Sequence, residues 1–331
     1  MHYTKLLRHW TNGPTAMAGA LLAIAFAVMA PAHAGEFQQG KARFGGPSWP
    51  GATMKSEVAM QVLDALGYET SYKQVSYSVA VNGVGNKDLD AYVAGWKPAH
   101  FNVIQPLIDE GKVESLVANV GNAKFGMAVP AYAYEAGVKS LGDLDAHAER
   151  FDAQMYGIES GSEFNKVAKQ AVADDRLGLG NWNVIESSTS GMLTQVRKKI
   201  ENEEWVAFNA WSPHWMNAAF DIEYIAFISD GELRGVDELS ADEAGNSIHT
   251  IVPTGLEQHD ANLHRFLKQY VINASIQSEW LYQYGFKDRP KEEVAREWLG
   301  KNMDSVLEWV DGVRTLDGQP ASSAVRSAFG N

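Results

Sequence analysis

Strand-like and helix-like segments alternate in two successive halves of the chain, and this alternation is the feature that most constrains the fold. In the first half we expect strands at 41–44, 68–75 and 88–95, helices at 54–66 and 103–110, and a Gly/Asn-rich turn at 82–86. In the second half we expect strands at 156–158, 183–186 and 205–210, with helices at 161–173 and 191–200. Because such alternation is typical of a mostly parallel sheet covered by helices, each half predicts an α/β unit.

The connections between the two halves predict two lobes with a ligand cleft between them. The strand-like run 125–130 is expected to leave the first lobe, and a strand at 248–252 to return to it. The predicted division is a signal segment at 1–34, a first lobe at 35–128 and 249–331, and a second lobe at 129–248. Two helices at 264–280 and 292–309 would complete the first lobe, with an acidic loop at 230–245 and an irregular tail after residue 312. This α/β arrangement resembles a bilobed, type II-like periplasmic solute-binding protein that closes around its ligand by hinge motion, although two-domain enzymes share the rhythm.

The first 34 residues have the features of a secretory signal peptide. Lys5 and Arg8 give a positive start, residues 15–30 are apolar, and Ala32-His33-Ala34 is a small-x-small cleavage signal. The apolar run is shorter than the roughly 20 residues of a membrane anchor and ends at Pro31. We therefore expect a periplasmic protein released by signal cleavage.

Composition excludes several classes of protein. The 331 residues include no cysteine, which rules out disulfides, thiol nucleophiles, cysteine-ligated metals and a lipid-anchored cysteine after the signal. The formal net charge of −13 disfavours binding to nucleic acid or anionic lipid. We expect a soluble monomer whose partners are a small molecule and a membrane transporter.

Motifs for catalysis, cofactors and metals are missing from the sequence. There is no G-x-S-x-G elbow, and Gly178-Leu179-Gly180 lacks the further residues of a phosphate-binding loop. The nine histidines include no H-E-x-x-H pair. The sequence predicts neither an enzyme nor a cofactor or metal site.

Three of the ten tryptophans point to a ligand site. Trp49, Trp96 and Trp211 each follow small residues at an expected strand end and precede a turn with proline, and the last two share one Trp-x-Pro plan. Ligands bind at strand ends of α/β sheets, and indole faces attract cations, so the three predict a cation cage. Trp215 is expected to support Trp211 from behind, and five others are expected in the core, namely Trp182, Trp205, Trp280, Trp298 and Trp309.

Two longer segments carry a family resemblance. Residues 210–217 (AWSPHWMN) with 220–224 (FDIEY), and residues 95–100 (GWKPAH), make the chain similar over about 40–310 to the glycine betaine/choline-binding proteins of osmoprotectant ABC importers. The resemblance implies that Trp49, Trp96 and Trp211 box a trimethylammonium head. It also implies that His100 holds the ligand's carboxylate, whereas His214 is expected to be structural.

The segment 160–164 resembles the family's glycine-containing loop, whose backbone amides grip the ligand's carboxylate. Ser162, Glu163 and Phe164 are the candidate residues here, at the start of an expected helix with free N–H groups. The loop is less glycine-rich than the family's, and Glu163 would oppose a carboxylate unless it turns away. Phe164 or Phe125 could add a fourth aromatic wall.

The sequence therefore predicts a binding protein for a quaternary ammonium solute, which it delivers to a membrane permease with an associated ATPase. Glycine betaine is the first choice; proline betaine, carnitine, dimethylsulfoniopropionate, choline and trimethylamine N-oxide stay open. A choline site would want an acidic side chain facing the head group and no carboxylate grip. The alternative from another class is an exported hydrolase using Glu159 and Glu163, and a receptor domain for a membrane sensor is a third possibility.

Overall fold

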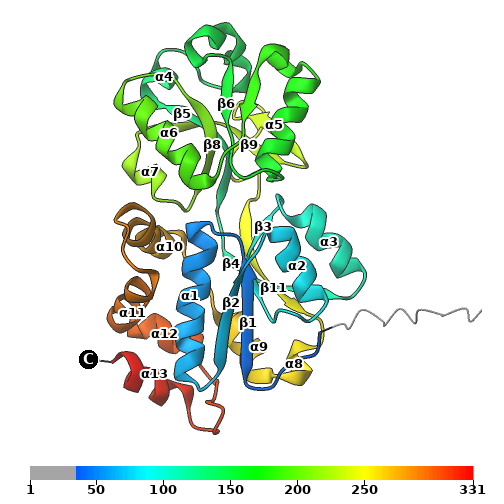
Figure 1. Ribbon diagram of the computed structural model, residues 1–331, viewed down its shortest axis with the longest axis vertical. Helices are drawn as coiled ribbons and strands as arrows, with labels where there is room; N and C mark the ends of the chain where they lie inside the picture. The colour runs from blue at the N-terminus through cyan, green and yellow to red at the C-terminus, as the bar shows by residue number, and fades with distance from the viewer. Residues whose placement is uncertain (1–34, 331) are drawn as a thin grey trace, which may run out of the picture. The chain divides into compact units, whose positions relative to one another are not determined.

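Two groups of strands organise residues 35–330, the part of the chain that the computed structural model describes (Figure 1). The expected signal segment at 1–34 lies outside these residues. The first group comprises β1 (Lys41–Gly46), β2 (Glu69–Gln74), β3 (Tyr92–Lys97), β4 (Val113–Val120) and β11 (Ser247–Pro253). The second comprises β5 (Lys124–Pro130), β6 (Gln154–Tyr156), β7 (Asn183–Ile185), β8 (Ala207–Ser212), β9 (Ile222–Ser229) and β10 (Glu232–Gly235). We call the elements around these groups the first and second lobes.

The strands of the first lobe run in mixed directions. β1 and β2 pair in parallel, and a parallel bridge from Phe44 to Ala91 links β1 to the segment before β3. β11 lies between β3 and β4 and is antiparallel to both. β11 joins the strands of this lobe and runs opposite to β1, β2, β3 and β4, which share one direction. The predicted mostly parallel arrangement therefore holds for four strands, and the returning strand makes the sheet mixed.

The second lobe holds a mixed six-stranded sheet in the order β10-β9-β5-β8-β6-β7. β6 is parallel to β7 and β8, whereas β5 is antiparallel to β8 and β9. β10 pairs with β9 as a hairpin, so the acidic stretch expected to be a loop contains a strand. Sheet membership changes between Val120 and Lys124 and again between Gly235 and Ser247, while the lobe limits at 128/129 and 248/249 stay predictions.

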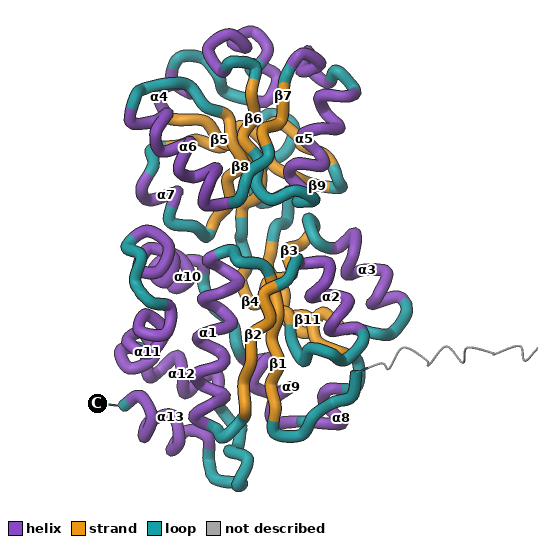
Figure 2. Tube along the Cα trace, in the orientation of Figure 1, coloured by secondary structure: helices purple, strands orange, loops and turns teal. Residues whose placement is uncertain are grey.

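Helices cover both sides of the strands in the first lobe, with α1 and α10 to α13 on one side and α2 and α3 on the other (Figure 2). The first-lobe helices are α1 (Pro50–Ala65), α2 (Tyr77–Gly85), α3 (Phe101–Asp109), α8 (Leu256–His259), α9 (Ala261–Gln269), α10 (Ala274–Leu281), α11 (Lys291–Lys301), α12 (Met303–Trp309) and α13 (Ala321–Phe329). Those of the second lobe are α4 (Ala131–Glu135), α5 (Glu163–Ala173), α6 (Thr189–Glu201) and α7 (Met216–Ala219). No helix of residues 35–330 is both long and apolar enough to cross a membrane.

Several expected helix limits and loops are wrong for identifiable reasons. The Gly/Asn-rich stretch at 82–86 is the end of α2, which Ser76 caps and which buries Ala80, Val81 and Val84. The tail after residue 312 contains α13, whose buried side chains recur every four residues, at Ala321, Val325 and Phe329. The long helices expected at 264–280 and 292–309 are each divided in two.

The five tryptophans expected in the core are all buried. The rings of Trp280 and Trp298 meet edge to face with centroids 5.0 Å apart, and Trp298 stacks on Trp309 at 5.5 Å. These contacts join α10, α11 and α12 into one layer against α1.

Candidate functional site

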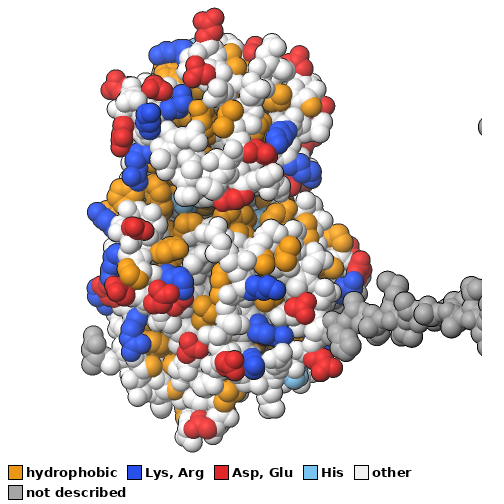
Figure 3. Space-filling view, viewed as in Figure 1, with side chains coloured by type: hydrophobic (Ala, Val, Ile, Leu, Met, Phe, Trp, Pro, Cys, Tyr) orange, Lys and Arg blue, Asp and Glu red, His pale blue; other side chains and the backbone are white. Residues whose placement is uncertain are grey.

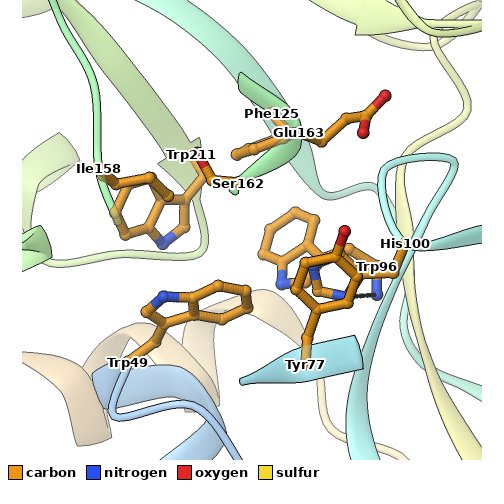
Figure 4. Close-up of a pocket in the computed structure, with 9 residues that line it drawn as sticks. All are labelled: Trp49, Tyr77, Trp96, His100, Phe125, Ile158, Ser162, Glu163 and Trp211. Atoms are coloured by element: carbon orange, nitrogen blue, oxygen red, sulfur yellow. Dashed lines mark hydrogen bonds between the residues drawn. The ribbon is translucent and has the colours of Figure 1, made fainter. Parts of the chain in front are cut away.

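A pocket lies between the two lobes and takes side chains from both (Figure 4). Its cavity measures about 30 Å³. In the space-filling view, hydrophobic side chains gather along the seam between the lobes (Figure 3). The first lobe contributes Trp49, Tyr77, Trp96 and His100, and the second contributes Phe125, Ile158, Ser162, Glu163 and Trp211.

Trp96 and Trp211 lie one residue before the ends of β3 and β8, as their shared Trp-x-Pro plan predicts. The following Lys97–Pro98 and Ser212–Pro213 peptide bonds are both cis. Trp96 and Trp211 are each 8% exposed, so each is largely buried and yet reaches the pocket. Two strands from separate sheets thus present one indole each to the same space.

Phe125 completes this aromatic wall from β5. The register of β5 and β8 places Phe125 directly opposite Trp211, so both side chains leave the same face of the sheet. The Phe125 ring lies 5.6 Å from the Trp96 ring across the pocket, at an angle of 42°. The pocket therefore has aromatic rings on both of its lobes.

Trp49 lies between β1 and α1, at the residue that precedes the helix. Its indole is partly exposed, and Nε1 donates a hydrogen bond of 3.1 Å to Oε2 of Glu159 in the second lobe. The Trp49 ring lies 5.4 Å from the ring of His100. Trp49 therefore contacts both lobes at once.

His100 is buried at the start of α3 and faces the pocket beside Tyr77. The two rings stack with centroids 4.1 Å apart and planes within 8°. Nδ1 accepts a hydrogen bond of 3.2 Å from the Trp96 amide and lies 3.2 Å from the Tyr92 hydroxyl. Burial lowers the pKa of His100 to about 3, opposed in part by a hydrogen bond with the Ala94 backbone. The imidazole is therefore neutral, and it offers a dipole rather than a positive charge to any ligand.

Ser162 and Glu163 open α5 at the other side of the pocket. Ser162 Oγ accepts a hydrogen bond of 3.3 Å from the Asn165 amide and so caps the helix. Glu163 is 5% exposed and receives a hydrogen bond of 3.4 Å from Asn102 Nδ2 of the first lobe. Its Oε2 lies 3.7 Å from the exposed Lys166 ammonium.

The Glu163 carboxylate is directed away from the indoles of Trp49 and Trp211 (Figure 4). Burial raises the pKa of Glu163, and the charge of Lys166 opposes the rise. Of the described residues that line the pocket, Glu163 alone has a carboxylate, and none is a lysine or an arginine. The pocket thus combines aromatic faces with one acidic residue in its lining, a combination that suits a cation.

Six of the seven residues predicted from the sequence line this pocket, and Phe164 does not. Phe164 is fully buried in the core of the second lobe. The suggestion that it forms a wall is corrected by helix geometry, because Phe164 is turned about 100° around α5 from Glu163. Phe125, the other candidate, lines the pocket.

Sequence reasoning missed Tyr77 and Ile158. Tyr77 begins α2 directly after the capping Ser76, and recognition of that cap would have placed an aromatic side chain at a helix start. Ile158 lies in the loop after β6, and no local pattern distinguishes it from a core residue. Trp215 was expected to support Trp211 directly from behind. Instead the ring of His214 contacts both indoles, with its centroid 4.8 Å from that of Trp211 and 5.1 Å from that of Trp215.

Known proteins resemble this chain over most of its length. Residues 40–301 match the family model of the substrate binding domain of the ABC-type glycine betaine transport system. A solved ABC-transporter choline-binding protein in complex with choline is 31% identical, covers 88% of this chain and 98% of its own, and superposes with a TM-score of 0.80. Lactococcal OpuAC complexed with glycine betaine shares the fold at 23% identity, covering 81% of this chain and 98% of its own, with a TM-score of 0.69.

Two further proteins are similar to this chain in sequence. The uncharacterized protein ORF1 of Chromohalobacter salexigens is 41% identical over 125 residues, which are 38% of this chain and 81% of that protein. The glycine betaine/carnitine transport binding protein GbuC of Listeria monocytogenes is 28% identical over 170 residues, or 51% and 53% of the two chains. The bilobed α/β fold and the resemblance predicted from the sequence are confirmed.

The family match begins just before β1 and ends with α11, so every residue that lines the pocket falls inside it. The chain belongs to the family of substrate-binding domains of ABC-type glycine betaine transport systems.

Proposed function

We propose that this protein captures a small quaternary ammonium ion among the indoles of Trp49, Trp96 and Trp211 and delivers it to the permease and ATPase of an ABC importer. The single observation that supports this most is the convergence of three indoles from two lobes on one pocket. Substrate-binding proteins of this family work outside the cytoplasmic membrane. The finer proposal is a periplasmic location, reached by cleavage of the segment 1–34.

The chemistry of the ligand explains why aromatic rings would select it. A quaternary ammonium group has no N–H to donate, so hydrogen-bond acceptors cannot recognise it. An indole face attracts such a cation by about 0.5–2 kcal/mol, at the upper end when water is excluded. Trp96 and Trp211 are nearly buried, which supports the upper end of that range.

Among quaternary ammonium ions, the charges of the pocket favour one without a carboxylate, such as choline. A betaine would bring a second carboxylate into a space whose lining has the Glu163 carboxylate, a neutral His100 and no cationic side chain. The free backbone amides at the start of α5 would be the remaining hydrogen-bond donors for the betaine carboxylate. Glu163, which carries a carboxylate of its own, is the first residue of the same helix. The expectation of glycine betaine from the sequence stays untested, and the proposal here moves to a monocation.

Calorimetric titration of the mature protein with tetramethylammonium, choline, glycine betaine and trimethylamine N-oxide tests this function. We expect choline and tetramethylammonium to bind. Trp96→Ala and Trp211→Ala should each weaken choline binding about tenfold, from a lost cation–π contact and lost buried area. A wild-type protein that binds none of the four compounds would sink the proposal, as would unchanged affinity in both variants.

An enzymatic role is less well supported than a binding role. Relatives by family and structure are substrate-binding proteins. Glu159, the suggested partner of Glu163 in a hydrolase, does not line the pocket and has its carboxylate engaged by Trp49 and Thr189. We expect choline to be recovered intact after long incubation with the pure protein.

A further inference from the structure

Glu159 lies outside the pocket but joins the two lobes beside it. Its Oε1 accepts a hydrogen bond of 2.9 Å from the Thr189 amide, and Oε2 accepts one of 3.0 Å from the Thr189 hydroxyl. Both of these bonds stay within the second lobe. The third bond, 3.1 Å from Trp49 Nε1 to Oε2, crosses to the first lobe.

The second lobe holds this carboxylate in a fixed orientation. Thr189 is buried at the first turn of α6, where backbone N–H groups lack partners within the helix. Asn165 fixes the loop itself, because its Nδ2 donates to the carbonyl oxygens of Ile158 at 2.8 Å and Glu159 at 3.1 Å. Oε2 of Glu159 is thereby held facing Trp49 of the other lobe.

Trp49 is the indole of the pocket that its own lobe holds least. It is partly exposed and precedes a helix, whereas Trp96 and Trp211 are nearly buried and belong to strands. The bond to Glu159 engages the single N–H group of this indole. With Nε1 directed to Glu159, the ring lies along the edge of the pocket (Figure 4).

We propose that Glu159 is a positioning residue for ligand capture, which fixes the Trp49 wall only when the two lobes are together. The inference rests on the proposed quaternary ammonium site. Glu159 does not touch the ligand; it acts through the indole N–H. In an open arrangement water would satisfy that N–H, so the bond to a preformed carboxylate contributes to the closed, ligand-holding state alone.

A double-mutant cycle between Glu159→Ala and Trp49→Phe tests this role. Trp49→Phe keeps an aromatic ring but removes the N–H donor. The cycle is needed because Glu159→Ala also takes a partner from Thr189, a loss that occurs equally in both backgrounds. The affinity and dissociation rate of choline and tetramethylammonium are measured for all four proteins.

We expect Glu159→Ala to weaken both ligands by roughly tenfold in the wild-type background, mainly through faster release, as fits the loss of a hydrogen bond to a charged group. In the Trp49→Phe background the same change should alter affinity less than about threefold, the coupling having been removed. Equal effects in the two backgrounds would overturn the inference. Tetramethylammonium has the methylated ammonium group of choline but no tail. If Glu159→Ala weakens both ligands equally, the effect therefore lies at the aromatic cage.

Glu204→Ala serves as the matched control. Glu204 belongs to the same lobe and its carboxylate accepts hydrogen bonds from Lys199 at 3.2 Å and Asn202 at 3.1 Å, but neither bond crosses to the first lobe. Its removal should leave affinity unchanged, and an effect as large as that of Glu159→Ala would overturn the inference. A wild-type protein that binds neither probe would instead refute the proposed function, so the two failures are distinguishable.

Discussion

Replacing Glu163 with glutamine removes the one carboxylate of the pocket lining and should change which ligand the protein prefers. Glutamine keeps the size of the side chain and can still accept the hydrogen bond from Asn102. The substitution therefore tests charge more than shape. Choline and glycine betaine share a trimethylammonium head and differ in the charge of the tail, so the ratio of their affinities reports on the carboxylate.

The size of the effect follows from Coulomb's law. Two unit charges roughly 6–8 Å apart interact by about 2–3 kcal/mol at an effective dielectric constant of about 20. The Lys166 ammonium, 3.7 Å from Glu163 Oε2 but mostly exposed, cancels part of this field. We expect Glu163→Gln to weaken choline by about 1–2 kcal/mol, or roughly 5- to 30-fold. Betaine should be weakened less or strengthened, because its carboxylate is no longer repelled.

Calorimetric titration of both ligands into the wild-type protein and the variant measures the ratio directly. Glu186→Gln is the control, since Glu186 is an acid of the same lobe that does not line the pocket. Lower pH should mimic the variant, because protonation removes the charge of Glu163. Burial raises the pKa of Glu163, so as the pH is lowered the affinity for choline should begin to fall at a higher pH than an ordinary glutamate would give. An unchanged ratio of the two affinities in Glu163→Gln would refute the assignment of a charge-selective role to this residue.

Two further predictions concern stability. Lys55 is buried, and its Nζ lies 2.9 Å from Asn119 Oδ1. Burial lowers the pKa of Lys55 well below 10.5, so between the two pKa values the unfolded protein binds more protons than the folded protein. The wild-type free energy of unfolding should therefore rise with pH from that lowered pKa up to 10.5, and urea denaturation of Lys55→Met should show a flatter slope; parallel curves would contradict this. Val325→Ala in α13 removes a fully buried side chain and should lower the free energy of unfolding by about 2 kcal/mol, whereas the same substitution at the exposed Val79 should cost much less.

The sequence by itself determined the features that depend on neighbouring residues. Proline restricts the residue before it, so Trp-x-Pro marked the ends of β3 and β8 without knowledge of the sheets. Apolar spacing predicted most of α1, and the alternation of elements predicted two α/β lobes. Trp49, Trp96 and Trp211 could be named as one candidate site because each shows the same local pattern.

The tertiary structure decided everything that depends on residues distant in the chain. β11 enters between β3 and β4, and this non-local pairing makes the sheet mixed. The register of β5 with β8 places Phe125 beside Trp211, while the rotation of α5 turns Phe164 into the core. The neutral state of His100 and the bond from Trp49 to Glu159 likewise arise only when segments far apart in sequence exclude water together, since burial and hydrogen-bond geometry are properties of the folded chain.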